Sequence, residues 1–297
     1  MIDKGGVRLP LVGLEVCVNR DPMSEQPLYS PRVVRELLSL YNLMPTKSFG
    51  QNFLIDGNIL KRIVEAAQIV PGDAVYEIGP GLGVLTQALA GTGAKVTSIE
   101  KDERLKPVLG QTLEGLGVHL HWGDCLEFPW DQVPEGSLLV ANLPYYISTA
   151  ILSQIFKSGR FRCAVVLVQK EVADRLVAQP GEPAYGFLSA IASLYGRAHI
   201  VRSIPKTAFF PVPEVTSALI RIDLGTDVPE PAWIHFLECC LAYRRKTLRN
   251  NLRAAGWDVS FLDDVLQSEG LPLEVRAEAI PLSSLNKIYC AMQSVTC

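Results

Sequence analysis

A glycine-rich turn that follows an apolar run is the first feature of the sequence whose residue types and spacing suit chemistry. Residues 77–83 read EIGPGLG, between a predicted strand and a predicted helix. Glycine tolerates positive φ and lets the backbone approach a ligand closely, and open α/β sheets bind ligands beyond the carboxyl ends of their strands. The dinucleotide fingerprint G-x-G-x-x-G would need glycine where this chain has Val84. Glu77, Gly79 and Gly81 therefore predict a site for a ligand without a pyrophosphate, with a purely structural turn as the alternative.

Two further acidic residues stand where neighbouring predicted strands end. Glu100 closes the strand after the glycine turn, and Asp124 follows the next strand. A carboxylate at the first position can accept from both hydroxyls of a ribose, and one at the second from an adenine amino group, each bond being worth about 1.5–3 kcal/mol. Singly, each acid is an ordinary exposed or capping residue. Together with the glycine turn they predict an adenosine site, which S-adenosylmethionine would fit because it carries a sulfonium and no pyrophosphate.

The fourth predicted strand ends on an amide, a proline and two aromatic rings. The apolar run 138–141 is followed by Asn142, Leu143, Pro144, Tyr145 and then a second tyrosine at 146. Because this strand ends at the same edge of the sheet, these residues face the same crevice. Structural alternatives exist for each: Asn142 as a turn former and the tyrosines as core aromatics.

The elements that must position these residues alternate between strand and helix. Strands are expected at 74–78, 95–99, 118–122, 137–141 and 163–168, and helices near 83–91, 101–114, 148–157 and 170–178. This alternation of apolar strands and helices predicts a parallel sheet covered on both faces. Runs at 198–204 and 216–222, on either side of a proline-rich bend, predict an antiparallel hairpin at its edge. Two helices are expected ahead of the sheet, one capped by Ser30 and one following Asp56.

Three segments are expected along the chain. Residues 1–29 lack periodicity and read as an extension in which Met23 is an alternative start; residues 30–225 form the α/β domain. Residues 226–297 form a small helical domain after a short proline-containing linker. Helical periodicity in that domain covers 231–256, 259–268 and 282–293. The predicted fold class is therefore α/β, a Rossmann-like sheet plus a small C-terminal helical domain.

Basic residues are concentrated at one place in that helical domain. The stretch from Arg244 to Arg253 holds five basic residues and no acidic one, whereas residues 254–297 hold six acidic and two basic side chains. Lys246, Arg249 and Arg253 recur at helical spacing and predict one basic face. The lack of compensating acids favours contact with nucleic-acid phosphates, with an ordinary solvated face as the alternative.

Composition excludes several classes of protein. The chain has 297 residues, 48% of them hydrophobic, and a formal net charge of −3, which argues against a general nucleic-acid coat protein. No apolar run reaches the roughly 18 residues of a membrane span, and the N-terminal residues make a poor targeting sequence. Seven cysteines form no CxxC pair, so neither a zinc site nor a disulfide framework is expected. We expect a cytoplasmic protein without membrane association or metal.

Eight motifs in one order carry a specific resemblance. They are KSFGQNFL (47–54), EIGPGLG (77–83), IEKD (99–102), GDCLE (123–127), NLPYY (142–146), QKEVADR (169–175), FFPVPEVTS (209–217) and YRRKTLRNNL (243–252). The set resembles the ribosomal RNA adenine N6,N6-dimethyltransferase family, specifically its small-subunit, KsgA-type branch, over residues 30–290. NLPY at a strand end is similar to the signature of methyltransferases that modify exocyclic amino groups of bases. The resemblance implies a class I methyltransferase that uses S-adenosyl-L-methionine.

The resemblance also implies how a target adenine is held. Its amino nitrogen is a poor nucleophile because the lone pair is delocalised, so the site must place it in line with the methyl group. The Asn142 side-chain oxygen and the Leu143 carbonyl would accept from that nitrogen, with Pro144 orienting the carbonyl. Tyr145 and Phe209 would hold the two faces of a base turned out of its helix.

The residue patterns and the resemblance together give two sets of site residues. The cofactor set is Gln51, Asn52, Leu54, Glu77, Gly79, Gly81, Glu100, Lys101, Asp124, Cys125 and Asn142. The RNA set is Arg244, Arg245, Lys246, Arg249 and Arg253. For Cys125 the ordinary alternative is a small buried hydrophobic residue. One departure from the family pattern is Phe187, which stands where a basic residue is usual and leaves one RNA contact in doubt.

The implied reaction is dimethylation of N6 of two adjacent adenines near the 3′ end of small-subunit ribosomal RNA. The implied partner is the small ribosomal subunit (30S), whose assembly the protein would assist, and we expect a monomer. Two alternatives stay open: a large-subunit ribosomal RNA methyltransferase, and a mainly non-catalytic assembly factor. The YRRKTLRNNL segment favours the small-subunit branch, and intact Glu77, Glu100, Asp124 and Asn142 argue against a purely non-catalytic role.

Overall fold

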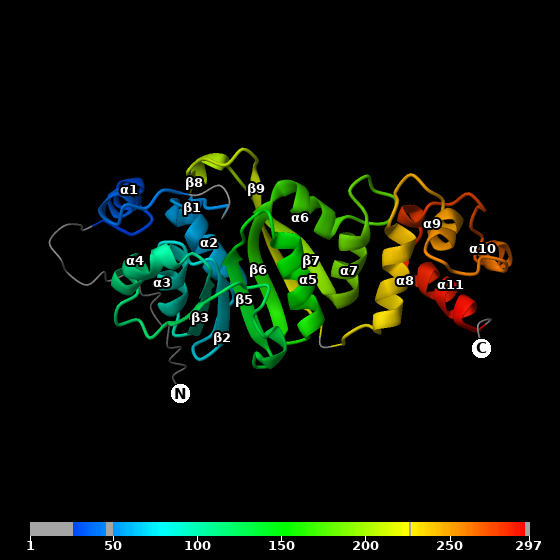
Figure 1. Ribbon diagram of the computed structural model, residues 1–297, viewed down its shortest axis with the longest axis horizontal. Helices are drawn as coiled ribbons and strands as arrows, with labels where there is room; N and C mark the ends of the chain where they lie inside the picture. Colours follow the sequence, from blue (N-terminus) through cyan, green and yellow to red (C-terminus); the bar gives the residue numbers. More distant parts are fainter. Residues whose placement is uncertain (1–25, 46–49, 226, 295–297) are drawn as a thin grey trace, which may run out of the picture.

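The computed structural model describes residues 26–45, 50–225 and 227–294, and a seven-stranded sheet occupies its centre (Figure 1). The strand order is β4-β3-β2-β5-β6-β9-β7. Its strands are β2 (Ala74–Ile78), β3 (Lys95–Glu100), β4 (His119–Trp122), β5 (Ser137–Asn142), β6 (Phe161–Gln169), β7 (Gly196–Ile204) and β9 (Ser217–Leu224). The first five in this order are parallel, and β9 runs antiparallel to both β6 and β7. The expected mostly parallel sheet with an antiparallel edge hairpin is confirmed.

Helices cover both faces of the sheet. They are α1 (Pro31–Leu40), α2 (Gly57–Ala67), α3 (Val84–Ala90), α4 (Lys106–Thr112), α5 (Ser148–Ser158), α6 (Lys170–Val177) and α7 (Phe187–Tyr195). Successive residues of β5 show the two layers: Leu138 and Val140 join the apolar cluster that includes α2 and α3, whereas Leu139 and Ala141 join the one that includes α5, α6 and α7. Fully buried strands of this kind read as continuous apolar runs. Helix α7 was not anticipated from the sequence.

The N-terminal helices differ in how they begin. Asp56 caps α2, accepting from the backbone N–H groups of Asn58 and Ile59 at 2.9 and 3.2 Å. Ser30 precedes α1 but its hydroxyl donates to Gln26 at 3.0 Å, so the expected side-chain cap is wrong. Packing also starts earlier than residue 30, because Leu28 is buried among residues of α2 and α3. Residues 1–25, with Met23, lie outside the described residues.

A two-stranded ribbon lies beside the main sheet. Strand β1 (Phe53–Leu54) pairs antiparallel with β8 (Phe209–Phe210), which follows the short helix η4 (Lys206–Ala208). Two-residue strands have too few positions to show a period of two, so the sequence did not predict them. The pairing brings residues 50–54 to the sheet domain from a distant part of the chain.

The C-terminal helices lie together at one end of the molecule (Figure 1). They share an apolar cluster that also includes Ala178, Tyr185 and Ala190 of the sheet domain. They are α8 (Pro231–Leu241), α9 (Leu248–Ala254), α10 (Leu262–Ser268), the short η5 (Ala277–Ala279) and α11 (Leu282–Ser294). The single helix expected over 231–256 is wrong, because the chain turns between α8 and α9. Thr247 caps α9 by accepting from the Asn250 N–H at 3.3 Å, and the Asn251 amide donates to the carbonyls of Cys240 and Tyr243 at 2.7 and 3.2 Å. These contacts satisfy the end of α8 and the start of α9. The domain limits at 225 and 226 stay a prediction.

Candidate functional site

An open cavity lies at the carboxyl ends of β2, β3 and β5. Its walls include the whole predicted cofactor set: Gln51, Asn52, Leu54, Glu77, Gly79, Gly81, Glu100, Lys101, Asp124, Cys125 and Asn142. Residues far apart in the chain are thus brought to one cavity. Their contact with a cofactor stays a prediction.

The glycine turn takes up the backbone conformation that its residue types permit. Gly79, Gly81 and Gly83 have φ of 70°, 58° and 90°, in the left-handed region that favours glycine. At Gly81 space is a second reason, since a Cβ atom would lie 3.1 Å from the ring of Phe53. Gly83 then begins helix α3. The turn leaves an uncluttered backbone surface against the cavity.

Glu77 is a buried carboxylate at the base of the cavity. One of its oxygens accepts from the hydroxyls of Thr86 and Ser98 at 2.6 and 2.7 Å. Burial raises the pKa of Glu77 to about 7, against these two hydrogen bonds, which lower it. Glu100, one strand away, is 7% exposed, and burial raises its pKa to about 7 as well. The cavity therefore contains two carboxyl groups that a cationic ligand would help to ionise.

Asp124 and its neighbours form the wall beyond β4. Its carboxylate accepts from Lys101 Nζ at 2.7 Å and from the Leu126 N–H at 2.9 Å, and the Lys101 hydrogen bond holds the pKa of Asp124 below its usual range. Cys125 is buried, and burial raises the pKa of its thiol to about 12. The thiol is therefore protonated at neutral pH and acts as an apolar wall.

Residues 50–54, which we name the bridging segment, pass over the glycine turn at the end of β2. Gln51 Nε2 donates to the Asp102 carboxylate beyond β3 at 2.8 Å, and the carbonyl of Asn52 accepts from Asn142 Nδ2 on β5 at 2.9 Å. Because β2 lies between β3 and β5, a segment attached to both neighbours must pass over the end of β2. The Phe53 ring lies against Gly81 as a result. Residues 47–49 of the same motif lie outside the described residues.

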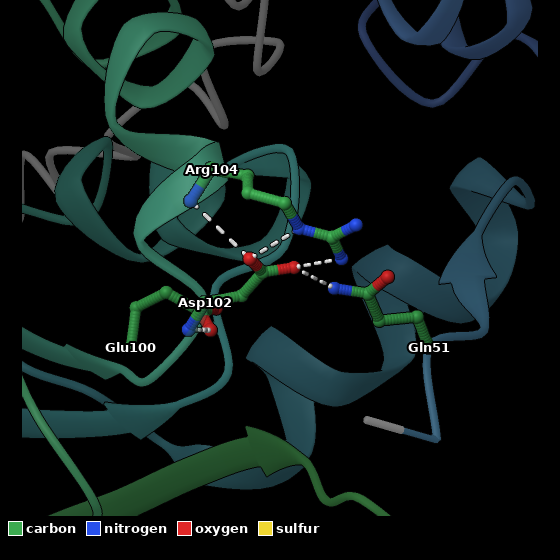
Figure 2. A network of polar contacts seen from close by, with 4 residues as sticks. All are labelled: Gln51, Glu100, Asp102 and Arg104. Carbon is green, nitrogen blue, oxygen red and sulfur yellow. Dashed lines mark hydrogen bonds and ion pairs between the residues drawn. The ribbon is translucent and has the colours of Figure 1, made fainter. Parts of the chain in front are cut away.

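The sequence did not single out Asp102, although it lies at the centre of a polar network (Figure 2). Its carboxylate accepts from Gln51 and from the Arg104 guanidinium, whose Nε and Nη2 lie at 2.8 and 2.7 Å. Its backbone N–H donates to Glu100 Oε1 at 2.7 Å. The signal available in the sequence was a second acid two residues after Glu100 within IEKD, a spacing typical of a turn.

Asn142 ends β5 with its amide oriented. Because Nδ2 donates to the Asn52 carbonyl, Oδ1 is left as an acceptor at the cavity that Asn142 lines. Leu143, whose N–H donates to the Leu167 carbonyl at 3.1 Å, and Pro144 line the same cavity. The Asn142 amide is therefore oriented so that its oxygen can accept a hydrogen bond from an amino group in the cavity.

Tyr145 and Phe209 are placed differently from one another. The Tyr145 hydroxyl lies 2.5 Å from Ser217 Oγ in a shared hydrogen bond, which fixes the ring beside the cavity. Phe209 is 0% exposed, packs in the core and does not line the cavity, so the structure does not bring the two rings to one open slot. Tyr146, in contrast, is 56% exposed, lines the cavity, and rests its ring against Gly50.

The basic stretch of the C-terminal domain spans a turn and the helix α9, so its basic residues do not form the single helical face that was expected. Lys246 lies before α9, with its ammonium 4.1 Å from the centre of the Tyr243 ring. Arg249 is bonded to Asp263 and Arg244 to the Pro183 carbonyl, so two arginines of the stretch have partners although the stretch itself contains no acid. Those partners lie outside the stretch itself, and folding brings them near. Within this stretch, the exposed side chains of Arg245, Lys246 and Arg253 have no hydrogen bond or ion pair to another described residue.

In the described ranges 26–45, 50–225 and 227–294, no helix is long and apolar enough to cross a membrane. Among those same residues, no group of three or more His, Cys, Asp or Glu side chains is arranged to hold a metal ion.

Comparison with solved structures identifies the class of protein. A dimethyladenosine transferase from Plasmodium falciparum superposes with a TM-score of 0.70 at 26% identity, over 82% of this chain and 98% of that one. The 23S rRNA methyltransferase ErmE superposes with a TM-score of 0.65 at 24% identity, over 82% of this chain and 100% of that one, which shows a shared fold. The sheet and its cavity are those of a class I methyltransferase.

Sequence comparison narrows the class to a family. The profile of the family described as "Ribosomal RNA adenine dimethylase" matches residues 44–290. A protein named "Ribosomal RNA small subunit methyltransferase A" from Deinococcus radiodurans is 54% identical over 268 residues, which cover 90% of this chain and 92% of the relative. The chain belongs to the ribosomal RNA adenine dimethylase family, and it is an enzyme of that kind.

Proposed function

We propose that this protein transfers methyl groups from S-adenosyl-L-methionine to N6 of two adjacent adenines near the 3′ end of small-subunit ribosomal RNA. Support for the substrate comes from relatives named "Ribosomal RNA small subunit methyltransferase A", such as those from Deinococcus radiodurans and Pelotomaculum thermopropionicum. The 30S subunit is the proposed partner, and a role in its assembly is part of the proposal. The protein would work as a monomer in the cytoplasm.

One observation carries the proposal most directly: Asn142 presents a fixed acceptor at a cavity suited to an adenosine ligand. The Asn52 carbonyl holds the amide nitrogen of Asn142 at 2.9 Å, so the oxygen faces an incoming amino group. Glu100 and Asp124, on the opposite walls, are the acceptors proposed for the ribose and the adenine amino group of the cofactor. The glycines with positive φ have no side chains, so the proposed cofactor can lie against the backbone of the turn. The residues present therefore fit the proposed cofactor.

The cofactor, when bound, supplies a methyl group on a sulfonium that an adjacent nucleophile can accept. The task of the protein is to position the adenine nitrogen, whose lone pair is delocalised into the ring. Asn142 Oδ1 and the Leu143 carbonyl accept from the amino group and favour tetrahedral geometry at nitrogen, while Pro144 fixes the turn. Positioning of this kind can lower a barrier by about 7–11 kcal/mol. The pocket must also admit a once-methylated amine, so Asn142 cannot hold two hydrogens in both rounds.

Tyr145 supplies a stacking face for the extruded adenine, a contact worth about 1–3 kcal/mol per base. Its hydroxyl contact with Ser217 keeps the ring from rotating away. Phe209 would have to leave the core to form the second face, so its proposed contact depends on a movement of β8.

A transfer assay tests the proposal. The protein is incubated with labelled S-adenosylmethionine and 30S subunits that lack these methyl groups, in parallel with free ribosomal RNA and 50S subunits. We expect label on 30S RNA, recovered as dimethylated adenine. Label on 50S RNA alone would favour the large-subunit alternative, and binding to 30S subunits without any transfer would favour a non-catalytic assembly factor.

A further inference from the structure

Besides the pairing of Phe53 and Leu54 with β8, two side-chain hydrogen bonds hold the bridging segment, and the two bonds differ in kind. On the β5 side it is held by Asn142, a residue of the proposed active site. On the β3 side it is held by Gln51, which donates to Asp102 at 2.8 Å (Figure 2). Asp102 is not among the residues that line the cavity. The bridging segment is therefore fixed both by Asn142, which lines the cavity, and by Asp102, which does not.

Asp102 is built to keep its carboxylate ionised and in place. It is 3% exposed, yet the guanidinium of Arg104 and the amide of Gln51 both donate to it, and Arg104 also donates its backbone N–H at 3.2 Å. The Arg104 hydrogen bond holds the pKa of Asp102 below its usual range. A buried carboxylate with several donors is costly to disturb, because any donor or acceptor left unpaired loses its full desolvation energy.

The same residue also orients Glu100. The backbone N–H of Asp102 donates to Glu100 Oε1 at 2.7 Å, and Glu100 is 7% exposed. One oxygen of the proposed ribose acceptor is therefore fixed by the residue whose side chain holds Gln51. The position of the bridging segment and the orientation of Glu100 therefore both depend on Asp102.

We infer that Asp102 is a positioning residue of the cofactor site, which joins the bridging segment to the ribose acceptor. Holding Gln51 keeps residues 50–54 over the glycine turn, and the N–H group keeps Glu100 aimed into the cavity. The bridging segment and Glu100 are then already in place before the cofactor binds, so binding loses less conformational entropy. The inference rests on the proposed cofactor and adds a residue that does not touch it.

The first test is a matched pair of glutamine variants. Gln51→Leu removes the donor to Asp102 at similar side-chain volume. Gln111→Leu makes the same substitution away from the cavity, where the glutamine accepts an exposed hydrogen bond from the Tyr41 hydroxyl. Affinity for S-adenosylmethionine and S-adenosylhomocysteine is measured by calorimetry without RNA. We expect about tenfold weaker binding for Gln51→Leu, as for loss of one charge-assisted hydrogen bond, and unchanged binding for Gln111→Leu.

A double-mutant cycle separates action through Asp102 from direct contact of Gln51 with the cofactor. Asp102→Ala and the double variant Gln51→Leu/Asp102→Ala are expected to bind the cofactor equally weakly, because one contact has been removed twice. Gln51→Glu, which places a second carboxylate against Asp102, is expected to lose more affinity than Gln51→Leu. This last variant keeps the test valid if Asp102→Ala does not fold.

Kinetics provide a readout that a merely structural role would not move. Gln51→Leu should raise the KM for S-adenosylmethionine by a larger factor than it lowers kcat. Wild-type cofactor affinity in Gln51→Leu, or effects of the two changes that simply multiply, would overturn the inference. Failure of the wild-type protein to bind the cofactor at all would instead refute the proposed function.

Discussion

Two regions of the molecule contain several ionisable side chains, which are buried in one region and exposed to solvent in the other. At the carboxyl edge of the sheet, Glu77 and Glu100 are 1% and 7% exposed, and burial raises the pKa of each to about 7. At the turn between α8 and α9, Arg245 and Lys246 are exposed. The first set costs stability unless a ligand compensates it, whereas the second set costs little.

The difference indicates what each region can recognise. Buried acceptors act over single hydrogen bonds and discriminate by geometry, so they suit a small cofactor and an amino group. Exposed cations act over about 8–10 Å and are screened by salt, so they suit a phosphate backbone and contribute little to base selection. Changes at the sheet edge should therefore alter chemistry and cofactor affinity, and changes at the turn should alter RNA affinity and its salt dependence.

The largest effect is expected at the active-site end of the sheet. Asn142→Ala removes the oriented acceptor for the target amino group, and we expect kcat to fall by about 100-fold or more, the scale seen when one preorganised transition-state contact is deleted. Cofactor affinity should fall much less, which calorimetry can check. Normal transfer by this variant would show that Asn142 does not hold the reacting nitrogen.

Glu100→Gln should separate binding from stability. Loss of the carboxylate is expected to weaken S-adenosylmethionine by about 10–100-fold, since two charge-assisted hydrogen bonds depend on it. The same change removes a desolvated charge, so at pH 8 the ligand-free protein should become more stable by about 1–3 kcal/mol. Urea unfolding and calorimetry measure the two effects, and parallel losses would mean that Glu100 is mainly structural.

The raised pKa of Glu100 also gives a pH dependence with a definite sign. Its folded value of about 7 exceeds its ordinary 4.5, so the stability that its protonated form contributes to the ligand-free protein is full below about 4.5 and lost as pH rises through 7. Cofactor binding needs the ionised form and should strengthen about tenfold between pH 6 and 8. Glu100→Gln serves as the control, in which this pH dependence of affinity should weaken and the part due to Glu77, whose pKa is also raised to about 7, should remain.

Smaller effects are expected in the basic stretch 244–253, where Arg245 in the turn and Arg249 on α9 provide a matched comparison. Arg245→Glu should weaken 30S binding and reduce the slope of log affinity against log salt by about 1–2, as expected when a phosphate contact is lost. Arg249→Glu would face Asp263, its present partner, and should lower stability by about 1–3 kcal/mol while leaving that slope unchanged. Binding across a salt series and thermal unfolding distinguish the two, and the reverse pattern would show that Arg249 is the RNA contact.

Much of the sheet domain was predictable because local pattern and tertiary fold agree there. Runs of consecutive apolar residues marked strands that are buried on both faces, and β2 lies where the pattern placed it, at 74–78. The C-terminal helices were less predictable. Helical periodicity continued through 242–247, where capping by Thr247 and Asn251 ends one helix and begins another. Capping by a residue eleven positions away cannot be seen in a periodic pattern.

The sequence by itself determined the chemical groups at the sheet edge, because the end of each parallel strand reaches the same edge whatever packs around it. Glycines at 79, 81 and 83, the acids at 77 and 100 and the amide at 142 required only that rule. Only the tertiary structure decided which groups are paired. Asp102 with Gln51, Asn142 with Asn52, and Arg249 with Asp263 are contacts across 51, 90 and 14 residues. Side-chain pairing over such separations depends on how layers pack, and residue spacing along the chain carries no record of it.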